Sequence, residues 1–337
     1  MSGAHKLFVW FPAIRAGSGA DVFTQRLAAA LIRRGHRAII SWFPHWSEFT
    51  PDLLRFRRAP SGVDVIHVNS TYAFAFRRRG VPLVATEHHY ILDPAYRRYK
   101  SPAQHLYHRT LIGPYLRRSY ALADAITTDS RFTANVLARS AGVQATRTIP
   151  LWVDYDTFSP AAGASKSDGR FRLLFVGNAS RRKGVDAIPV LARRLGADFE
   201  IRCTSGLRTD RSNDSGDNIT LLGRLREDQL IQEYRTCDAV LVPSRYEGFG
   251  YTALEAMACG KPVVGFRCGA VDEVVVEGET GLLCDIDDLD MLEQNCRRLA
   301  GDVALARAFG QAGRERATSA FTEAGAINDY LDLYRAL

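Results

Sequence analysis

Short apolar runs alternate with segments of strong helix formers along most of the chain. Strands are predicted at residues 6–11, 38–42, 63–69, 81–86, 172–177, 200–206, 219–223 and 239–242. The strands at 63–69 and 81–86 read as continuous apolar runs, which is typical of a strand buried on both faces of a parallel sheet. Because helical segments and turn residues separate the predicted strands, the pattern predicts an α/β protein assembled from βαβ units.

The chain length predicts two such assemblies. A chain of 337 residues is too long for one ordinary core and fits two domains of roughly 150 residues each. We place the first domain at residues 1–160 and the second at 170–320, joined by a linker rich in Ala, Gly and Ser at 161–169. Residues 321–337 are predicted to form a closing helix that packs back toward the first domain.

The most informative stretch is a strand end, a glycine loop and a helix between residues 239 and 264. Gly248 and Gly250 let the backbone pass close to a bound group, and strong helix formers fill residues 252–258. A helix that opens out of a glycine turn presents unpaired N–H groups and a positive dipole end, which suits phosphate. Glu247 and Glu255 bracket this predicted phosphate seat.

These two glutamates form an E-x7-E pair inside a recognisable motif. Glu-Gly-Phe-Gly-x-x-x-Leu-Glu-Ala-Met-Ala-Cys-Gly-x-Pro-Val-Val, at residues 247–264, closely resembles the donor-site signature of retaining GT-B glycosyltransferases of the family 4 type, also called glycosyl transferases group 1. The resemblance implies two Rossmann-like domains that face each other across a cleft. The alternative is a buried strand, turn and helix with two solvated glutamates.

The resemblance also implies roles for the residues of this motif. Glu247 is expected to contact the donor sugar, and Glu255 to hold the ribose hydroxyls. The intervening backbone is expected to bind the donor diphosphate through Gly248, Phe249, Gly250, Tyr251 and Thr252.

A second motif follows the apolar run at 172–177. In the family that the chain resembles, an Arg and a Lys at this place neutralise the donor diphosphate, and cations there stabilise the charge that builds up on the departing phosphate. Lys183 matches the Lys, and Gly177 ends the run. Asn178 stands where the Arg is usual, so Arg182, or alternatively Arg181, must supply the second charge. Ordinary surface cations are the alternative interpretation.

Three further donor or catalytic positions rest on the same resemblance. Gly19 lies in a loop, Gly17-x-Gly19, that lacks the third glycine and the acidic residue of a dinucleotide fingerprint. The resemblance places Gly19 opposite the donor phosphates or the acceptor. The turn at Gly223 and Leu225 is expected to supply backbone groups to the nucleotide base.

His88 follows the apolar run at 81–86. Carboxyl ends of parallel strands are where α/β sheets bind ligands, and the resemblance places a histidine here near the reacting sugar, with His89 as a less favoured substitute. A hydrogen-bonded structural histidine is the alternative. Residues 96–122, which are polar and aromatic, are predicted to be helical and to line the acceptor side.

One departure from the family lies at the predicted crossing between the domains. Leu151-Trp152 replaces the usual Asn-Gly, so the backbone angles of this turn must differ.

No cofactor and no metal are expected. The six cysteines all lie in the second half, without C-x-x-C or zinc-like histidine spacing, and are interpreted as reduced thiols. Two Asp-x-Asp triplets, at 285–287 and 288–290, precede a predicted helix at 289–299. We interpret these acids as helix-capping residues, with a metal-dependent sugar transferase as the alternative.

The net charge of +7 is concentrated in the first half of the chain. Residues 1–160 hold 21 Lys and Arg against 10 Asp and Glu, whereas residues 161–337 hold 23 against 27. Arginine clusters interleaved with aromatic residues suit an anionic membrane surface or a lipid-diphosphate acceptor, although solvated helix faces would look the same. No nucleic-acid-binding motif accompanies them, and no nucleic acid partner is expected.

No apolar run approaches the roughly 18 residues that span a bilayer. We therefore expect cytoplasmic residence, with peripheral attachment to the inner face of the plasma membrane. The function implied by the resemblance is retaining, metal-independent transfer of a hexose from a nucleotide-diphosphate sugar, UDP-hexose favoured and GDP-mannose next. The expected acceptor is a hydroxyl of a glycolipid, lipopolysaccharide or polysaccharide precursor. The alternatives are a catalytically silent sugar-nucleotide or glycan-binding protein of the same fold and, less favoured, a nicotinamide-dependent oxidoreductase.

Overall fold

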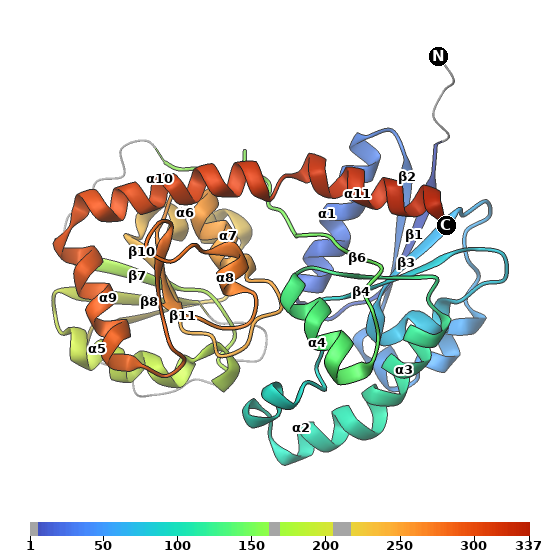
Figure 1. Cartoon of the computed structure of the whole chain (residues 1–337), viewed down its shortest axis with the longest axis horizontal. Helices are drawn as coiled ribbons and strands as arrows, with labels where there is room; N and C mark the ends of the chain where they lie inside the picture. Colours follow the sequence, from blue (N-terminus) through green and yellow to red (C-terminus); the bar gives the residue numbers. More distant parts are fainter. Residues whose placement is uncertain (1–5, 162–168, 205–216) are drawn as a thin grey trace. The chain divides into compact units, whose positions relative to one another are not determined.

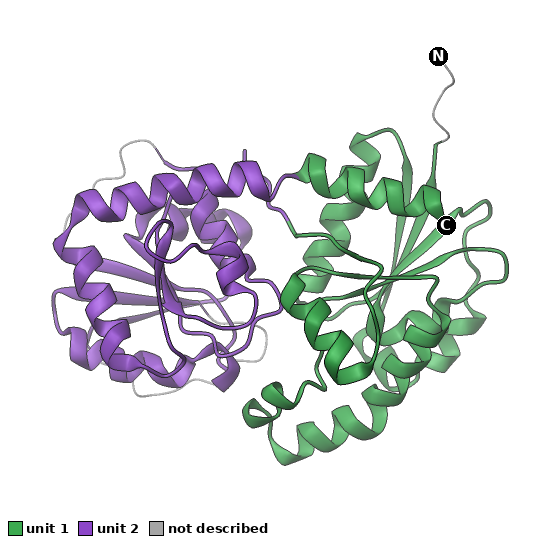
Figure 2. Ribbon diagram, viewed as in Figure 1, with its two compact units in different colours: residues 1–151, 323–337 green, residues 152–322 purple. Residues whose placement is uncertain are grey.

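The computed structural model describes residues 6–161, 169–204 and 217–337, and the chain folds into two compact units. Unit 1 contains residues 1–151 and 323–337, and unit 2 contains residues 152–322 (Figure 2). The linker predicted at 161–169 lies almost entirely outside the described residues.

Unit 1 contains a six-stranded parallel sheet in the order β2-β1-β3-β4-β5-β6 (Figure 1). Its strands are β1 (Phe8–Ile14), β2 (Arg37–Phe43), β3 (Val65–Asn69), β4 (Leu83–Glu87), β5 (Ala125–Thr128) and β6 (Arg147–Thr148). The strand β2 is added on one side of β1, and β3 to β6 are added in turn on the other side. The order in which strands are added therefore reverses between β1 and β3, and open α/β sheets bind ligands at such a point.

The α-helices of unit 1 are α1 (Gly19–Arg33), α2 (Pro102–Tyr107), α3 (Gly113–Leu122), α4 (Arg131–Ala141) and α11 (Glu323–Ala336). Four 3-10 helices, η1 (His45–Phe49), η2 (Pro51–Phe56), η3 (Ser70–Phe76) and η4 (Pro94–Tyr99), and the π-helix η5 (His108–Ile112) complete the described elements. The helix predicted over 96–122 is thus broken into four pieces. Pro102 and Pro114 each sit at the start of a piece, where a missing N–H costs nothing.

The last helix, α11, packs within unit 1. Tyr334 lies 2.5 Å from Nδ1 of His67, a fully buried histidine of β3, and Arg33 at the end of α1 pairs with Glu323 at 2.5 Å. Burial, together with the charge of His88, lowers the pKa of His67 to about 3. His67 is therefore a neutral part of the core.

Unit 2 repeats the architecture with the sheet order β12-β11-β10-β7-β8-β9, again all parallel. Its strands are β7 (Phe171–Phe175), β8 (Phe199–Thr204), β9 (Ile219–Gly223), β10 (Ala239–Val242), β11 (Val263–Phe266) and β12 (Gly281–Cys284). From β7, the strands β8 and β9 are added on one side of the sheet, and β10, β11 and β12 are added in turn on the other side. The direction of this sheet therefore reverses between β7 and β10.

The helices of unit 2 are α5 (Ile188–Leu195), α6 (Glu227–Thr236), α7 (Tyr251–Ala258), α8 (Val271–Val274), α9 (Leu289–Gly301) and α10 (Val303–Ala320), with the short 3-10 helices η6 (Arg181–Lys183) and η7 (Val185–Ala187). Leu191 and Leu195 of α5 and Leu292 and Cys296 of α9 share one buried cluster with the strands. Gly313 of α10 lets that helix approach Met257 of α7, because a Cβ at Gly313 would lie 3.1 Å from Met257 Cγ.

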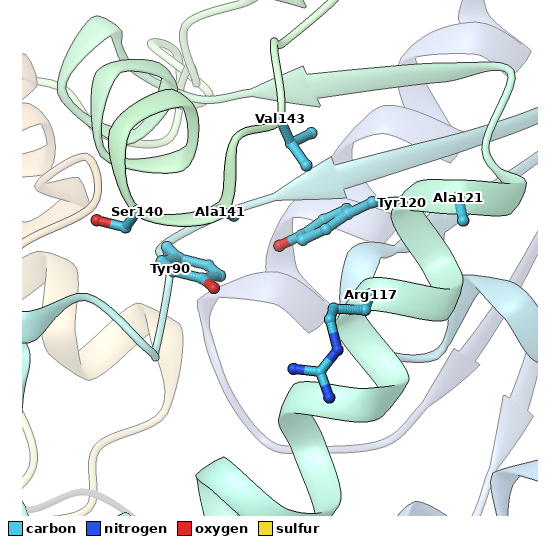
Figure 3. A pocket seen from close by; sticks show the side chains of 7 residues that line it. All are labelled: Tyr90, Arg117, Tyr120, Ala121, Ser140, Ala141 and Val143. Carbon is cyan, nitrogen blue, oxygen red and sulfur yellow. The ribbon is translucent and has the colours of Figure 1, made fainter.

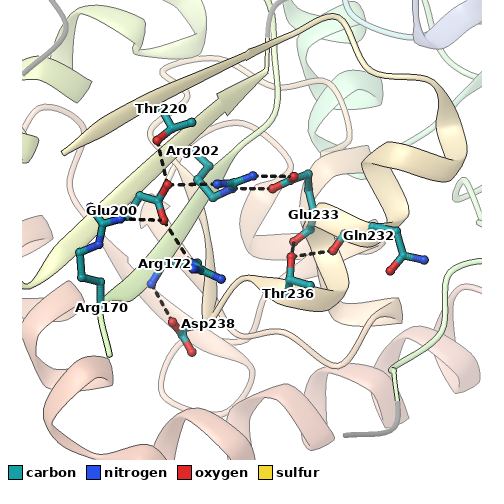
Figure 4. A network of polar contacts seen from close by, with 9 residues as sticks. All are labelled: Arg170, Arg172, Glu200, Arg202, Thr220, Gln232, Glu233, Thr236 and Asp238. Atoms are coloured by element: carbon teal, nitrogen blue, oxygen red, sulfur yellow. Dashed lines mark hydrogen bonds and ion pairs between the residues drawn. The ribbon is translucent and has the colours of Figure 1, made fainter. Parts of the chain in front are cut away.

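A charged network joins three strands near the amino end of this sheet (Figure 4). Buried Glu200 accepts hydrogen bonds from Arg172, Arg202 and Thr220 at 2.8–3.0 Å. Arg202 in turn holds Glu233 of α6 through two bonds of 2.7 and 2.8 Å. Burial alone would raise the pKa of Glu200, but these donors and the nearby arginines lower it, so the carboxylate is ionised and fixed in place.

The sequence pattern predicted most of these elements. The βαβ order is confirmed, the strand at 239–242 coincides with β10, and the helix predicted at 252–258 is α7 with one more residue. Ser130 caps α4, accepting from Thr133 N at 3.0 Å. Asp288 likewise caps α9 and accepts from Met291 N at 2.9 Å. The first strand begins two residues later than predicted, at Phe8.

All six cysteines are free and buried. The prediction of unpaired thiols is confirmed, and none of them is a surface thiol. Burial raises the pKa of Cys203, Cys259 and Cys284 to about 12, and it also raises the pKa of Cys268 and Cys296. Within the described parts of the chain, no helix is long and apolar enough to cross a membrane.

Gly265 of β11 offers a test of how closely β10 and β11 pack. A Cβ at this position would lie 2.1 Å from the carbonyl oxygen of Val242, whereas a Cβ at Gly301, at the end of α9, meets nothing within 4 Å. We expect Gly265→Ala to lower the free energy of unfolding of unit 2 by roughly 1–3 kcal/mol. Gly301→Ala is the matched control and should be neutral or raise it by up to about 1 kcal/mol. Urea unfolding followed by circular dichroism measures both, and equal values for the two variants would contradict the packing.

Candidate functional site

The candidate site of unit 2 lies where its sheet changes direction. The loops after β7 and β10 leave neighbouring strands at this point, and both leave from the carboxyl edge. Such a switch point opens a crevice between the two connections, in which α/β sheets bind their ligands. The first loop carries Gly177, Arg182 and Lys183, and the second carries Glu247 to Gly250.

Three of the predicted catalytic residues meet here. Glu247 is buried, and its Oε1 accepts hydrogen bonds from Lys183 Nζ and, at 2.7 Å, from Ser244 Oγ. Its Oε2 lies 3.4 Å from a terminal nitrogen of Arg182, which also donates to the Tyr246 carbonyl at 2.9 Å. Arg181 is exposed, and no ion pair links its side chain to Glu247 among the described residues. Of the two arginines that the sequence left open, Arg182 is therefore the one beside Glu247.

The electrostatics of this cluster favour the ionised carboxylate. Burial alone would raise the pKa of Glu247, but the charges of Lys183 and Arg182, with the hydrogen bonds from Lys183 and Ser244, outweigh it and lower the pKa to about 2. A buried carboxylate held ionised by two cations forms a preorganised polar centre, whose charges are already oriented.

Backbone packing fixes the two loops against each other. Arg245 N donates to Arg182 O at 2.8 Å, and Gly184 adopts a left-handed conformation with φ +74°. A Cβ at Gly184 would lie 1.9 Å from the carbonyl oxygen of Pro243, so only glycine fits. The Lys183 stem passes beside Gly177, where a Cβ would make an ordinary 3.5 Å contact with Lys183 Cδ.

The amino end of α7 opens beside this cluster. Gly250 precedes the helix with φ +108°, a conformation that favours glycine, and donors of the first helical turn point out of the helix end. The Thr252 hydroxyl donates to Val176 O at 3.4 Å, which ties α7 to the end of β7. Gly248, Phe249 and Gly250 are buried, whereas Tyr251 and Thr252 are partly exposed. The predicted diphosphate seat and the predicted cations thus share one edge of one sheet.

Glu255 lies one turn into α7 and has a partner that the sequence did not indicate. Its Oε2 accepts a 2.9 Å hydrogen bond from the hydroxyl of Tyr234, a fully buried residue of α6. Tyr234 therefore fixes the carboxylate that is predicted to bind ribose. No spacing rule connects two helices separated by a strand, so only the structure could reveal this contact.

Ser180 is a second residue that sequence reasoning missed. It begins the turn that carries Arg182 and Lys183, and Lys183 N donates to Ser180 O at 2.9 Å. Its buried Oγ has no hydrogen-bond partner among the described residues. Buried hydroxyls are normally paired, so this one suits a ligand group next to the cations.

The other predicted donor positions lie at the same edge of unit 2 or in unit 1. Gly223 ends β9 with φ +68°, and Leu225 follows it, partly exposed. Gly19 is the first residue of α1, after β1 at the switch point of unit 1. There the Asp21 carboxylate accepts from Ala16 N and Gly17 N at 3.0 and 2.7 Å, so these two loop amides are already engaged.

His88 lies at the carboxyl end of β4 and has a dedicated acid. Its Nδ1 lies 2.6 Å from Oδ2 of buried Asp129, which follows β5, and the ring packs edge-on against Phe23. Burial alone would lower the pKa of His88, but the charge and hydrogen bond of Asp129 and the charge of Glu87 raise it. Oδ1 of Asp129 has no hydrogen-bond partner within the described chain. Asp129 therefore positions the His88 ring, a role that the sequence motifs did not indicate.

A pocket of about 460 Å³ lies between α3 and α4 (Figure 3). Tyr90, Arg117, Tyr120, Ala121, Ser140, Ala141 and Val143 line it, and none of them is a predicted site residue. The Tyr120 hydroxyl donates to buried Glu87, whose other partner at the same oxygen is Ser70 at 2.7 Å. Burial raises the pKa of Glu87, although these donors oppose the shift.

The described residues contain no group of three His, Cys, Asp or Glu side chains arranged to hold a metal ion.

The Glu247 cluster predicts a pH-dependent stability. The pKa of Glu247 in the folded protein is about 2, below its ordinary value of 4.5. The ionised carboxylate therefore contributes stability above pH 4.5, and this contribution is lost as the pH falls toward 2. Lys183→Met removes one cation and leaves burial to raise the pKa. We expect it to lower the free energy of unfolding of unit 2 at neutral pH by on the order of 3 kcal/mol, and the loss to shrink in acid. Urea unfolding over a pH series measures this.

The matched control is Arg193→Met, which removes an exposed cation on α5. It should change the free energy of unfolding by less than about 0.5 kcal/mol at every pH. A Lys183→Met effect that stays constant from neutral to acid pH would contradict the pairing with Glu247.

The His88 pair predicts a shift that NMR can follow. Asp129→Asn keeps the shape of the side chain but removes the charge that stabilises protonated His88. We expect the pKa of His88 to fall, measured from its ring Cε1–H signal. An unchanged His88 titration would show that Asp129 does not set its protonation.

Two family models match the chain in succession. Residues 24–157 match the Glycosyltransferase Family 4 model, and residues 170–302 match the model of Glycosyl transferases group 1. Together they include every predicted site residue except Gly19.

Curated relatives share part or most of this length. An uncharacterised glycosyltransferase from Methanocaldococcus jannaschii is 34% identical over 146 residues, which are 42% of this chain and 42% of that protein. The chain thus spans less than half of that relative. MMP alpha-(1->4)-mannosyltransferase from Mycolicibacterium hassiacum is 27% identical over 310 residues, covering 84% of this chain and 74% of the relative.

Solved structures share the fold of both units. Sucrose-phosphate synthase from Thermosynechococcus elongatus matches with a TM-score of 0.82 at 22% identity, covering 97% of this chain and 98% of that one. The paired parallel sheets, the two consecutive family models and this likeness agree, and the chain belongs to the GT-B glycosyltransferases, with a Glycosyltransferase Family 4 domain followed by a Glycosyl transferases group 1 domain.

Proposed function

We propose that the protein transfers a hexose from a nucleotide-diphosphate sugar to an acceptor hydroxyl, with retention of configuration and without a metal. The observation that carries this proposal is the cluster of Glu247, Lys183 and Arg182 beside the amino end of α7. It combines a carboxylate, two cations and a helix N-terminus at the switch point of one sheet. A sugar linked to a diphosphate presents groups that each of these would bind.

The step divides naturally among these residues. The bond between the anomeric carbon and the diphosphate oxygen breaks, and the acceptor oxygen forms a new bond to that carbon on the same face. The departing phosphate takes the acceptor proton. Lys183 and Arg182 stabilise the negative charge that grows on the phosphate, and the first amides of α7 add to this effect. Glu247 accepts a hydrogen bond from a sugar hydroxyl and orients the ring.

The ion pairs of Glu247 fit this division. A bound diphosphate would compete with Glu247 for the two cations, because it carries more negative charge than one carboxylate. As the cations turn toward the phosphate, the Glu247 oxygens become available to sugar hydroxyls. Ser244, which donates to Oε1 at 2.7 Å, keeps the carboxylate in place during this exchange.

The proposed donor is a nucleotide-diphosphate hexose, and the proposed acceptor is a glycan or glycolipid hydroxyl. We favour UDP-hexose because such donors are the commoner ones in the family. GDP-mannose is the second choice, and the similarity to a mannosyltransferase supports it. The acceptor is a hydroxyl of a glycolipid, lipopolysaccharide or polysaccharide precursor. The basic first half suits an anionic acceptor and an anionic membrane, at the cytoplasmic face of which the protein would work.

A catalytically silent binding protein of the same fold remains the competing proposal. It would keep the donor contacts but release no nucleotide. Release of the nucleoside diphosphate from UDP-hexose or GDP-mannose distinguishes the two proposals. A transferase releases it in the presence of acceptor, or slowly by hydrolysis, and a binding protein does not.

Nucleotide binding is the first test of the proposal. We expect one of UDP, GDP, TDP and ADP to raise the melting temperature, since a ligand at a hundred times its Kd adds roughly 2.7 kcal/mol of stability. Glu255→Gln keeps an acceptor for Tyr234 but loses the charge, so it should weaken that binding by roughly tenfold. NAD is included as the ligand of the oxidoreductase alternative and should have no effect.

Lys183→Ala separates the chemical step from binding. Because Lys183 acts on charge that grows in the transition state, its loss should lower kcat by roughly 100-fold or more, with a smaller change in nucleotide affinity. The control is Arg193→Ala, on the exposed side of α5, which should keep the wild-type turnover. Full turnover in Lys183→Ala would refute the site assignment.

A further inference from the structure

We infer that η1 and η2 of unit 1 form a membrane-docking surface that inserts aromatic side chains into an anionic lipid bilayer. Four large apolar residues, Trp46, Phe49, Leu53 and Phe56, point into solvent from these two short helices. We call them the exposed stripe. The inference names a partner surface for the proposed function and rests on that proposal only for the idea that the acceptor lies in a membrane.

The exposure of these side chains is large for their type. They are 63%, 55%, 58% and 72% exposed, in the order in which they occur. Thirteen large apolar residues are exposed in the described chain, and four of them fall within the eleven positions 46–56. Large apolar patches on a soluble surface mark contacts with a partner or a membrane.

The spacing shows that the stripe is one face of a two-faced segment. Each 3-10 helix carries two stripe residues three positions apart, Trp46 and Phe49 on η1 and Leu53 and Phe56 on η2, so each pair lies on one side of its helix. The opposite side is buried and consists of Ser47, Pro51 and Leu54. Because Pro51 and Leu54 already anchor the segment in unit 1, the stripe is not needed for its packing.

A neighbouring helix extends the same surface. The Phe49 ring lies 6.2 Å from the Tyr107 ring at the end of α2, so the stripe adjoins that helix. Leu106, next to Tyr107, is a further exposed apolar residue at 61%. Arg109 in the following turn is exposed as well.

The charges around the stripe favour an anionic partner. Of the two acids of the segment, Asp52 is bound by Arg118 at 2.9 and 3.2 Å, and Glu48 is partly buried and accepts from the Tyr72 hydroxyl at 3.5 Å. Arg55, Arg57 and Arg58 are exposed, and none of their guanidinium groups forms an ion pair within the described residues. Arg55 instead stacks over the Phe56 ring at 5.0 Å.

This combination fits a lipid surface better than a folded partner. Trp, Phe and Leu next to Arg are the residues that bury their rings at the acyl boundary while the cations meet lipid phosphates. Apolar burial and electrostatic attraction then add, and each alone is weak. The buried side of the segment stays packed while the exposed stripe already faces solvent, so insertion requires no refolding.

Vesicle binding tests the inference with the whole protein. We expect sedimentation with vesicles of phosphatidylglycerol and weak or no sedimentation with phosphatidylcholine. Trp46→Ser with Phe49→Ser should weaken the binding by roughly tenfold or more. Arg57→Gln with Arg58→Gln should weaken it and reduce its dependence on salt.

A matched control removes an exposed apolar residue elsewhere. Val303, at the start of α10 in unit 2, is 69% exposed, so Val303→Ser loses a similar solvent-facing group away from the stripe. It should bind vesicles as the wild type does. All variants change exposed side chains, and their melting temperatures should stay within about 2 °C of wild type.

Trp46 supplies a direct readout of insertion. Its emission should move to shorter wavelength with anionic vesicles and be quenched by lipids with brominated acyl chains, and both signals should vanish in Trp46→Phe. Wild-type binding by the stripe double variant, or binding without any Trp46 signal, would overturn the inference. A dimer in solution that becomes a monomer in the double variant would assign the stripe to a second copy of the chain and also overturn it.

These results are independent of the proposed chemistry. The stripe variants should keep the nucleotide-induced rise in melting temperature, because the Glu247 cluster lies in unit 2. Failure of vesicle binding with normal nucleotide binding rejects the docking surface alone, and the reverse outcome rejects the transferase site alone.

Discussion

The candidate donor site depends on one electrostatic constraint, the burial of the ionised Glu247. A carboxylate removed from water must be compensated, and here Lys183, Arg182 and Ser244 do so from two loops that leave neighbouring strands. Gly184 lets these two loops approach, and Gly269, which follows β11, lets a third segment approach the Glu247 carbonyl; a Cβ would collide with a carbonyl oxygen at either position. Gly269 also brings Ala270 N to the Glu247 carbonyl at 3.0 Å. Two glycines and three polar partners thus hold one charge at the edge of the sheet.

Near the carboxyl edge of its sheet, each unit has a buried polar atom without a hydrogen-bond partner in the described part of the chain. In unit 2, the Glu200 network near the amino end is fully satisfied, whereas the carboxyl-edge site retains an unpaired buried hydroxyl at Ser180. In unit 1, the His88 and Asp129 pair leaves one Asp129 oxygen without a partner among the described residues. Saturated networks stabilise a fold, and unsaturated ones are the places where a ligand group completes the hydrogen bonding. Both unsaturated groups lie at carboxyl ends of strands.

Sequence patterns could predict what depends on local order. Apolar runs and helix formers gave the strands and helices, because burial on both faces leaves no alternation to misread, and the 247–264 motif marked the loop and helix that surround Glu247. Contacts between elements were not predictable: Tyr234 reaches Glu255 from another helix, and Asp129 reaches His88 from another strand. The break of 96–122 into four pieces depended on Pro102, Pro114 and tertiary packing. The exposed stripe was also missed, because an apolar residue's spacing does not reveal whether its side faces the core.

The buried thiols make the molecule suitable for labelling. All six native cysteines lie in the interior, and burial holds several of them far from the pH at which a thiolate would form. Reagents that react with thiolates at neutral pH should therefore leave the folded protein unmodified. A cysteine introduced on the surface of each unit would then be the single reactive group of that unit. Spin labels at such a pair would report the distance between the units in solution, with and without nucleotide, without removal of any native residue.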